Sequence, residues 1–331
     1  MTKHSDIQQD LIETAQLPNG AAGLVVSLDR GALPMEEPVA GAPARRRRGK
    51  SRTKRRTSKE KQRRIEPNFR IAYCGTLSIV DKQGEALHTI RYGRMPHGDA
   101  VALAEGLASD VFAHRARSRG PLHVTLVQDG AVEPWNLLDA QLNEETLGFA
   151  PCRLIDMFHL VEKLAEAAKA LHDEFDAKAA LRRWKVRLLN AKTGAKMNRE
   201  LHGANSRATA VHEAITYIEN NADRMNYATA RSEGRPLGSG CVEATCKSLG
   251  ALRMKRPGAR WKEDTGEHIV QLRALSLSDR WEAALRLTLQ RCSRFERQFA
   301  GRRDQHENPP RRWPCSQQER PAPWLGRTRS S

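Results

Sequence analysis

Two aspartates end apolar, β-branched segments of the chain and could hold a metal ion. Asp29 closes the run GLVVSLD (23–29), and Asp129 comes shortly after the run 122–127. Runs of this kind, bounded by Gly, Pro or Asn, are typical of buried strands. Carboxylates at converging strand ends suit Mg2+ or Mn2+, hard cations that take oxygen ligands and support phosphodiester cleavage. The alternative is structural, because an aspartate after a strand often forms a turn and Asp129-Gly130 is a common turn dipeptide.

The segments around these aspartates predict one mixed α/β sheet. Two β-rich segments flank the turn 81–84 and predict a hairpin. The predicted strands are 23–29, 69–80, 86–92, 122–127 and 152–155, and the predicted helices are 100–115, 134–147 and 158–171. A three-strand meander, a helix, a parallel strand and a further strand-helix unit make a sheet of the ribonuclease H type. In such a sheet, acids lie where strand ends converge.

The second half of the chain is expected to be helical. Residues 173–235 show helical patterns without a convincing strand, and GRPLGSG (234–240) separates them from expected helices at 242–254 and 267–289. We therefore expect an N-terminal tail, a core, a helical insertion and the closing helices of the core, which span 1–20, 21–172, 173–235 and 236–290. Two stretches lack periodicity and are expected to be disordered: the basic insertion 36–66 and the tail 291–331.

The charge of the chain points to a polyanionic partner. Its 331 residues carry a formal net charge of +17, and phosphate neutralisation by Lys and Arg releases counterions, so nucleic acid is the expected partner. No apolar run is long enough for a membrane helix, and the first ten residues lack the apolar region of a signal peptide. We expect a cytoplasmic protein. The six cysteines match no zinc motif, even at the closest pair, Cys241 and Cys246, so we expect reduced structural thiols.

Four segments, in order, carry a resemblance to a known family. They are VVSLD (25–29), VTLVQDGAVEPWNLL (124–138), RLIDMFHLVEKL (153–164) and GSGCVEATCKSLGALRMKRPGARW (238–261), with GTLSIVDKQGEALHTIRYGRMP (75–96) between the first two. The last segment closely resembles the glutamate motif of the ISKra-type insertion-sequence transposases, a group in the Mutator-like branch of the DDE transposases. The resemblance extends over about 24–290.

This resemblance implies a catalytic triad of Asp29, Asp129 and Glu243. It also implies a ribonuclease H-like core, interrupted by a helical insertion before the glutamate helix. The three carboxylates would bind two Mg2+ or Mn2+ ions, which activate water for nicking and then the freed 3′-hydroxyl for strand transfer. The implied partners are the terminal inverted repeats of the transposon and target DNA, and DDE enzymes generally act as homo-oligomers in a synaptic complex.

Two further acids compete for a place in the centre. Asp156 ends the predicted strand 152–155 and begins a D-x-x-H pair with His159, where related transposases often carry C-x-x-H. His159 could orient a phosphate or a neighbouring carboxylate. Alternatively, Asp156 caps the helix that follows and His159 is a packed helix residue. Asp81 is a weaker rival for the first acid, because it lies in the turn between the hairpin strands.

A basic run after Glu243 could contact DNA. Its candidate residues are Lys247, Arg253, Lys255, Arg256, Arg260 and Trp261. Pairing with phosphates and stacking on bases would suit DNA near the scissile bond. The alternative is a solvated helix end, with Trp261 anchored in the core. The cations of 45–64 would add affinity without sequence specificity, although a merely solubilising loop is the other reading.

The chain departs from the family pattern in two places. Only 28 residues precede Asp29, where family members usually have a sizeable segment expected to recognise transposon ends, so we expect a shortened copy. The first acid is usually followed by Gly, whereas Arg30 precedes Gly31 here. A catalytically inactive DNA-binding remnant and a ribonuclease H-like nuclease without strand transfer are therefore the alternative functions.

Overall fold

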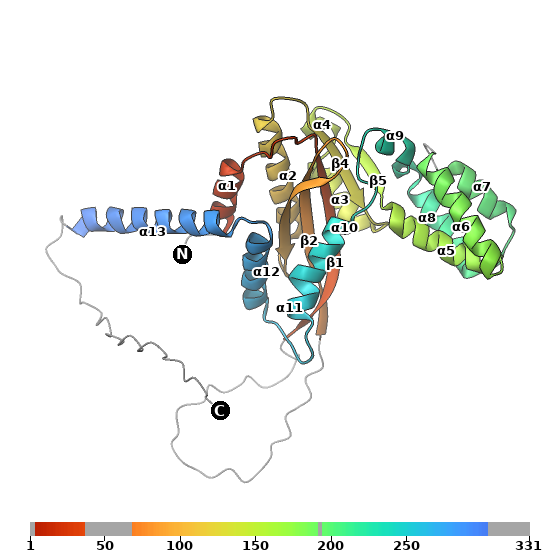
Figure 1. Cartoon of the computed structure of the whole chain (residues 1–331). Coiled ribbons are helices and arrows are strands. Elements are labelled where there is room, and N and C mark those ends of the chain that lie inside the picture. The colour runs from red at the N-terminus through yellow and green to blue at the C-terminus, as the bar shows by residue number, and fades with distance from the viewer. Residues whose placement is uncertain (1–3, 37–67, 191–193, 304–331) are drawn as a thin grey trace, which may run out of the picture. The chain divides into compact units, whose positions relative to one another are not determined.

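A mixed five-stranded sheet forms the core of the computed structural model (Figure 1), which describes residues 4–36, 68–190 and 194–303. The strand order is β3-β2-β1-β4-β5. Strands β3, β2 and β1 pair antiparallel, and β1, β4 and β5 pair parallel. The strands are β1 (Gly23–Met35), β2 (Asn68–Val80), β3 (Ala86–Arg94), β4 (His123–Gln128) and β5 (Cys152–Ile155). The α/β class is confirmed, and this order is consistent with a ribonuclease H-like fold.

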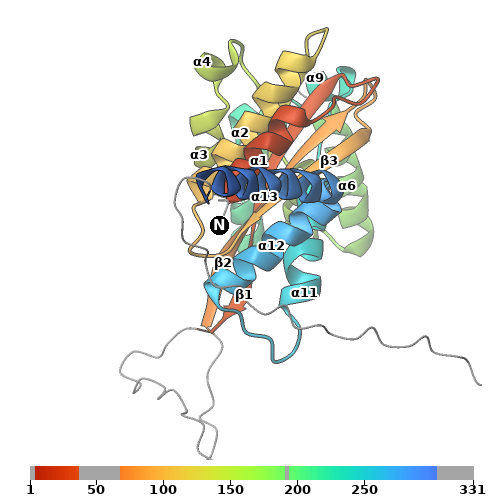
Figure 2. The same ribbon diagram turned by 90° about the vertical axis from the view of Figure 1, so that its left-hand side faces the viewer.

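Helices cover both faces of the sheet. The helices of the core are α1 (His4–Thr14), α2 (Ala100–Arg117), α3 (Val132–Gln141), α4 (Glu144–Leu147), α5 (Met157–Leu171), α10 (Gly240–Thr245), the π-helix η2 (Cys246–Ala251), α11 (Leu252–Met254) and α12 (Glu263–Leu277). Leu103 and Leu107 of α2 pack against Gly75 on one face, whereas Val270 of α12 and Leu249 of η2 pack against Gly93 on the other. Figure 2 shows α1 beside α2.

The segment expected to be a helical insertion contains helices and no strand among its described residues. It forms α6 (Glu174–Leu189), α7 (Ala195–Gly203), α8 (Thr209–Asn220), the 3-10 turn η1 (Ala222–Arg224) and α9 (Tyr227–Ser232). Helices α6 and α8 both pack against α5, to one side of the sheet (Figure 1). The apolar side of α8, with Val211, Ala214 and Ile218, is buried in the same core cluster as Leu160 and Leu164 of α5.

Three expectations about the ends of the chain need correction. The N-terminal tail contains α1, whose Leu11 and Ile12 are buried. The single helix expected at 267–289 is two helices, α12 and α13 (Trp281–Arg303), because Asp279 adopts a positive φ of 54° and turns the chain between them. The disordered tail expected from 291 is helical as far as Arg303. Most of the basic insertion, including 45–64, and the tail beyond 303 lie outside the described residues.

By its internal contacts the chain divides into Met1–Arg286 and Leu287–Ser331. Everything described below lies in the first unit. None of the described helices combines the length and apolar character needed to cross a membrane.

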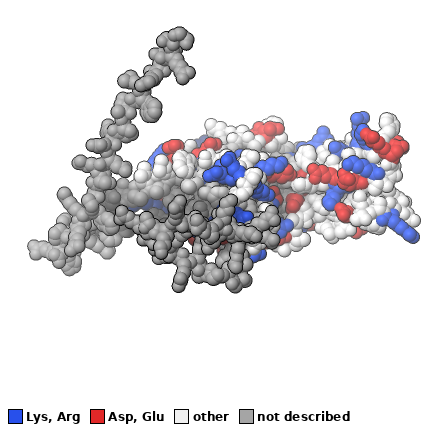
Figure 3. All heavy atoms as spheres, turned by 90° about the horizontal axis from the view of Figure 1, so that it is seen from below, with Lys and Arg blue, Asp and Glu red and all other residues white. Residues whose placement is uncertain are grey.

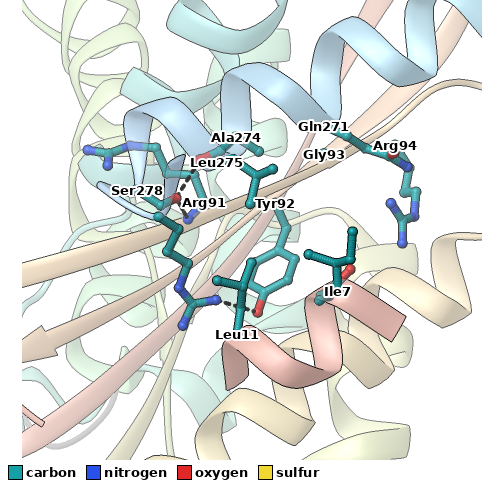
Figure 4. Close-up of a pocket in the computed structure, with 12 residues that line it drawn as sticks. Ile7, Leu11, Arg91, Tyr92, Gly93, Arg94, Gln271, Ala274, Leu275 and Ser278 are labelled. Carbon is teal, nitrogen blue, oxygen red and sulfur yellow. Dashed lines mark hydrogen bonds between the residues drawn. The ribbon is translucent and has the colours of Figure 1, made fainter. Parts of the chain in front are cut away.

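A buried charged network joins β3, α2 and the end of α12. Asp110 is fully buried and binds Arg280, with 2.9 Å between Oδ2 and Nη1, as well as the hydroxyl of Tyr92 and the ring of His114. Beside it lies a small cavity of about 40 Å3. Figure 4 shows Ile7 and Leu11 of α1 on one side of the Tyr92 ring and α12 on the other. Because every charge in the network has a partner, we assign it a structural role.

Candidate metal centre

Three aspartates follow matching positions on the parallel strands β1, β4 and β5. In the strand register, Val26 pairs with Leu126, and Gln128 pairs with Ile155. Asp29 and Asp129 each lie three residues after the paired residues Val26 and Leu126. Asp129 and Asp156 each lie one residue after the paired residues Gln128 and Ile155. Because side chains alternate between the faces of a sheet, continuing this register beyond the last pairs predicts the three acids on one face, although Asp129 and Asp156 follow the ends of β4 and β5. The carboxyl ends of parallel strands are the usual site of binding and catalysis in such sheets.

The prediction that Asp29 lies at the tip of its strand is wrong. Strand β1 continues to Met35, and Asp29 pairs with Cys74 inside the ladder with β2. Pairing of β1 with β4, however, ends at Val26. Beyond it, the buried side chain of Gln128 accepts a hydrogen bond from the Leu28 N–H at 2.8 Å. Asp29 therefore sits where β1 has lost its β4 neighbour, although it is not at a strand end.

Arg30 lines the cavity of Asp29 and Glu243, but its guanidinium pairs with Glu133 of α3. Neighbouring residues of a strand point to opposite faces, so Arg30 and Asp29 diverge. The guanidinium of Arg30 lies 2.5 Å from Glu133 Oε2, and the Tyr73 hydroxyl donates to the other oxygen of Glu133 at 2.6 Å. This hydrogen bond, ahead of the Arg30 charge, lowers the pKa of Glu133. The cation that follows Asp29 is thus paired with a local acid.

Glu243 lies on α10, which crosses the face that carries the aspartates. Helix α10 packs on β1 and β2, and Glu243 and Asp29 line a shared cavity of about 190 Å3. The helix continues as the π-helix η2, which widens the turn next to this cavity; π-turns inside helices are frequent at functional sites. Cys74 and Cys246 line the same cavity. A hydrogen bond with Cys74, followed by burial, raises the pKa of Cys246, so its thiol stays protonated and is a poor ligand.

The carboxylate of Asp156 is fully buried and holds two helices together. Its Oδ1 accepts from the backbone of Phe158 at 2.6 Å and of His159 at 3.3 Å, which caps α5. Its Oδ2 accepts from Ser239 twice, from the backbone N–H and from the hydroxyl, both at 2.5 Å. Ser239 is the residue before α10. Asp156 therefore joins the start of α5 to the start of the glutamate helix.

Asp156, His159 and Glu243 form a group whose possible ligand atoms lie within 4.8 Å of one another. In the described part of the chain, no other group of three such residues meets this distance, so the ligand atoms of Asp29, Asp129 and Glu243 do not. We discount Asp156 as a ligand because four donors already occupy its two oxygens. Glu243 instead faces His159, with 3.3 Å between Oε1 and Nε2. Burial lowers the pKa of His159, but Asp156, Glu162 and Glu243 together raise it by more.

Asp129 lines a different cavity from that of Asp29 and Glu243. It lines an open cavity of about 660 Å3 with Gly130, His159 and Tyr217 of α8. Its Oδ1 accepts from the Ala131 N–H at 3.0 Å, which is the turn expected for Asp-Gly. Asp29 thus shares one cavity with Glu243, Asp129 shares another with His159, and His159 lies beside Glu243.

The donors on this face have the chemical type that suits a divalent cation preferring oxygen, although the ligand atoms of Asp29, Asp129 and Glu243 do not all lie within 4.8 Å of one another. Asp29, Asp129 and Glu243 offer carboxylates along the walls of two open cavities, and the neighbouring thiol of Cys246 is protonated. Such a donor set suits Mg2+ or Mn2+ rather than a soft metal. Asp81, the weaker rival, accepts from Gln83 and Glu85 in its hairpin turn, both at 2.9 Å, so it is a turn former.

The predicted DNA-contacting residues divide into four exposed cations, the half-buried Arg260 and a structural tryptophan. Among the described residues, no ion pair involves Lys247, Arg253, Lys255, Arg256 or Arg260. Figure 3 shows Lys and Arg side chains gathered over part of one face of the molecule. Trp261, in contrast, pairs with the end of β1, and its indole N–H donates to Met254 O at 3.0 Å. Trp261 anchors the loop after the glutamate helix.

Sequence reasoning did not find Ser239 or Tyr217, although both contact this region. Ser239 follows Gly238 in the GSG segment, which could have been recognised as the start of a helix. Tyr217 carries no local signal, because it reaches the site from a helix of the insertion. Comparison with known protein families found no family that matches the chain, and comparison with curated proteins found no similar sequence.

Proposed function

We propose that this chain is a metal-dependent DNA transposase of the DDE type, which cuts DNA strands and transfers 3′-hydroxyl ends. One observation carries the proposal: Asp29 and Glu243 line one cavity beneath α10, and Asp129 follows β4, the parallel strand that pairs with β1 as far as Val26. The same three acids are those implied by the resemblance to ISKra-type transposases. The net charge of +17 supports a DNA partner.

Asp29, Asp129 and Glu243 would hold the divalent ions. When bound, such ions activate a water or hydroxyl nucleophile and stabilise the leaving oxygen of a phosphodiester. The other residues of the site have roles of their own. Asp156 fixes the start of α10 through Ser239, which sets the position of Glu243 on its helix. His159, whose pKa is raised, can carry a positive charge for a phosphate oxygen beside Glu243.

The exposed cations after Glu243 would hold the DNA backbone. Lys247 lines the cavity of Asp29 and Glu243, and Arg253, Lys255 and Arg256 follow on the exposed side of α11 and its loop. Cations without acidic partners are available to phosphates, and each such contact adds affinity that falls as salt rises. This arrangement places charge for DNA next to the acids proposed to cut it.

The test is nicking and joining of labelled DNA that carries the terminal inverted repeats, with Mn2+ or Mg2+. Asp129→Asn and Glu243→Gln should each abolish both steps. Glu174→Gln is the matched control, because it removes one carboxylate charge from the exposed surface of α6, where Glu174 pairs with Lys178. It should act as wild type.

Other results of this assay would assign a different function or overturn the assignment of the acids. Wild-type protein that nicks but never joins is a nuclease of the ribonuclease H type. Wild-type protein that binds DNA but never nicks it is an inactive remnant. Nicking that survives in both Asp129→Asn and Glu243→Gln would overturn the assignment of these acids.

A further inference from the structure

The hydroxyl of Tyr217 is buried and donates to no acceptor among the described residues. The Gly130 N–H is close enough to lower its pKa, but it does not meet normal hydrogen-bond geometry. A buried polar group in this state is unusual and destabilises the fold, since it has lost water and gained nothing. Of the buried polar atoms in this condition, the Tyr217 hydroxyl is the one whose residue lines the cavity of Asp129 and His159. Such groups often have a functional reason.

The backbone is adapted to let Tyr217 approach Asp129. A methyl group at Gly130 would lie 2.5 Å from Cε2 of the Tyr217 ring, so the ring packs directly on the glycine that follows Asp129. This contact joins α8 of the helical insertion to the end of β4. Burial raises the pKa of Tyr217, the charge of Asp129 and then that of Asp156 raise it further, and the backbone of Gly130 partly offsets the rise.

Only one of these two acids can accept a hydrogen bond from the Tyr217 hydroxyl. Both oxygens of Asp156 are occupied by the backbones of Phe158 and His159 and by Ser239. Asp129, in contrast, uses one oxygen for the Ala131 N–H, and no hydrogen bond within the described residues involves its Oδ2. Of the two acids, Asp129 therefore has the oxygen that is available to accept from the hydroxyl.

We propose that Tyr217 is a positioning residue that donates a hydrogen bond to Asp129 when this carboxylate holds a divalent ion. The inference rests on the proposed function. Carboxylates that bind metal are themselves usually held by hydrogen bonds, and loss of such a partner typically weakens metal binding by about ten- to a hundredfold. The helical insertion thereby contributes directly to the order of the metal centre.

The test compares Tyr217→Phe with Tyr227→Phe, two substitutions that each remove only a hydroxyl group. Tyr227 is also buried, but its hydroxyl donates to Ile155 O at 3.0 Å. Mn2+ binding is measured on the full chain without DNA, by electron paramagnetic resonance of free Mn2+, and the melting temperature is measured without metal. Tyr217→Phe should weaken Mn2+ binding about tenfold or more and leave the melting temperature unchanged or higher. Tyr227→Phe should lower the melting temperature and leave Mn2+ binding unchanged.

A double variant shows whether the effect passes through Asp129. In an Asp129→Asn background, Tyr217→Phe should cause no further loss of Mn2+ binding, because the two groups act as one unit. Unchanged Mn2+ binding by Tyr217→Phe, or a full additional loss in the double variant, would overturn the inference. Wild-type protein that binds no Mn2+ would instead reject the metal centre itself, and with it the role of Tyr217.

Discussion

Replacement of Asp156 by Asn tests whether this acid is a clamp between helices or a metal ligand. The amide oxygen of Asn can still cap α5, but its NH2 group would face the Ser239 N–H, which now binds Oδ2 at 2.5 Å. A hydrogen bond to a charged group contributes about 1.5 to 3 kcal/mol, and a buried donor without an acceptor costs about as much. We therefore expect Asp156→Asn to lower the free energy of unfolding by about 2 to 3 kcal/mol.

The assay is urea denaturation in the presence of EDTA, where no metal contributes to stability. Glu243→Gln is the control, because Glu243 is half-exposed and its pair with His159 should contribute less than about 1 kcal/mol. A metal ligand behaves in the opposite way, since removal of one clustered carboxylate relieves repulsion in the metal-free protein. The clamp is refuted if Asp156→Asn is as stable as wild type, or more stable, without metal.

Three further predictions concern the core and the approach of Tyr217. Arg280→Met should lower the free energy of unfolding by about 3 to 5 kcal/mol in urea denaturation, because it leaves the buried Asp110 charge without its cation. Adding Asp110→Asn should restore much of the lost stability. Burial lowers the pKa of His123 below 6.5 in the folded chain, so the unfolded chain binds this proton more readily. The melting temperature should fall as pH drops below 6.5, less steeply in His123→Gln; an equal slope contradicts this. Gly130→Ala should lower the free energy of unfolding by about 1 to 3 kcal/mol, because the added methyl group clashes with the Tyr217 ring. Adding Tyr217→Leu to Gly130→Ala should recover stability if this clash is the cause.

Local patterns were sufficient to locate the elements of the sheet. Strand β5 runs from Cys152 to Ile155 as predicted, because a short apolar run between Pro151 and the capping Asp156 leaves little choice of bounds. The Asp81 turn predicted the β2–β3 hairpin for a similar reason, since its side chain binds the backbone of the turn itself. These features depend on residues close in sequence, so the sequence contains all their partners.

Features that depend on partners distant in the chain could not be predicted from the sequence. Strand β1 extends past Asp29 because β2 supplies hydrogen-bond partners as far as Asn68, on the other side of a long basic segment. The expected helix 267–289 contains Asp279, whose positive φ ends α12, and no Gly or Pro marks that break. Trp261 could equally have been exposed for base stacking until its pairing with β1 was known.

The sequence by itself determined the α/β class, the order of the sheet strands and the candidate acids Asp29 and Asp129, because apolar periodicity and turn residues are local signals. Resemblance added Glu243. Only the tertiary structure decided which groups surround them: the four donors that occupy Asp156, the pairing of His159 with Glu243, and the approach of Tyr217 to Gly130. These contacts join segments that are far apart in the chain, and packing alone sets their distances.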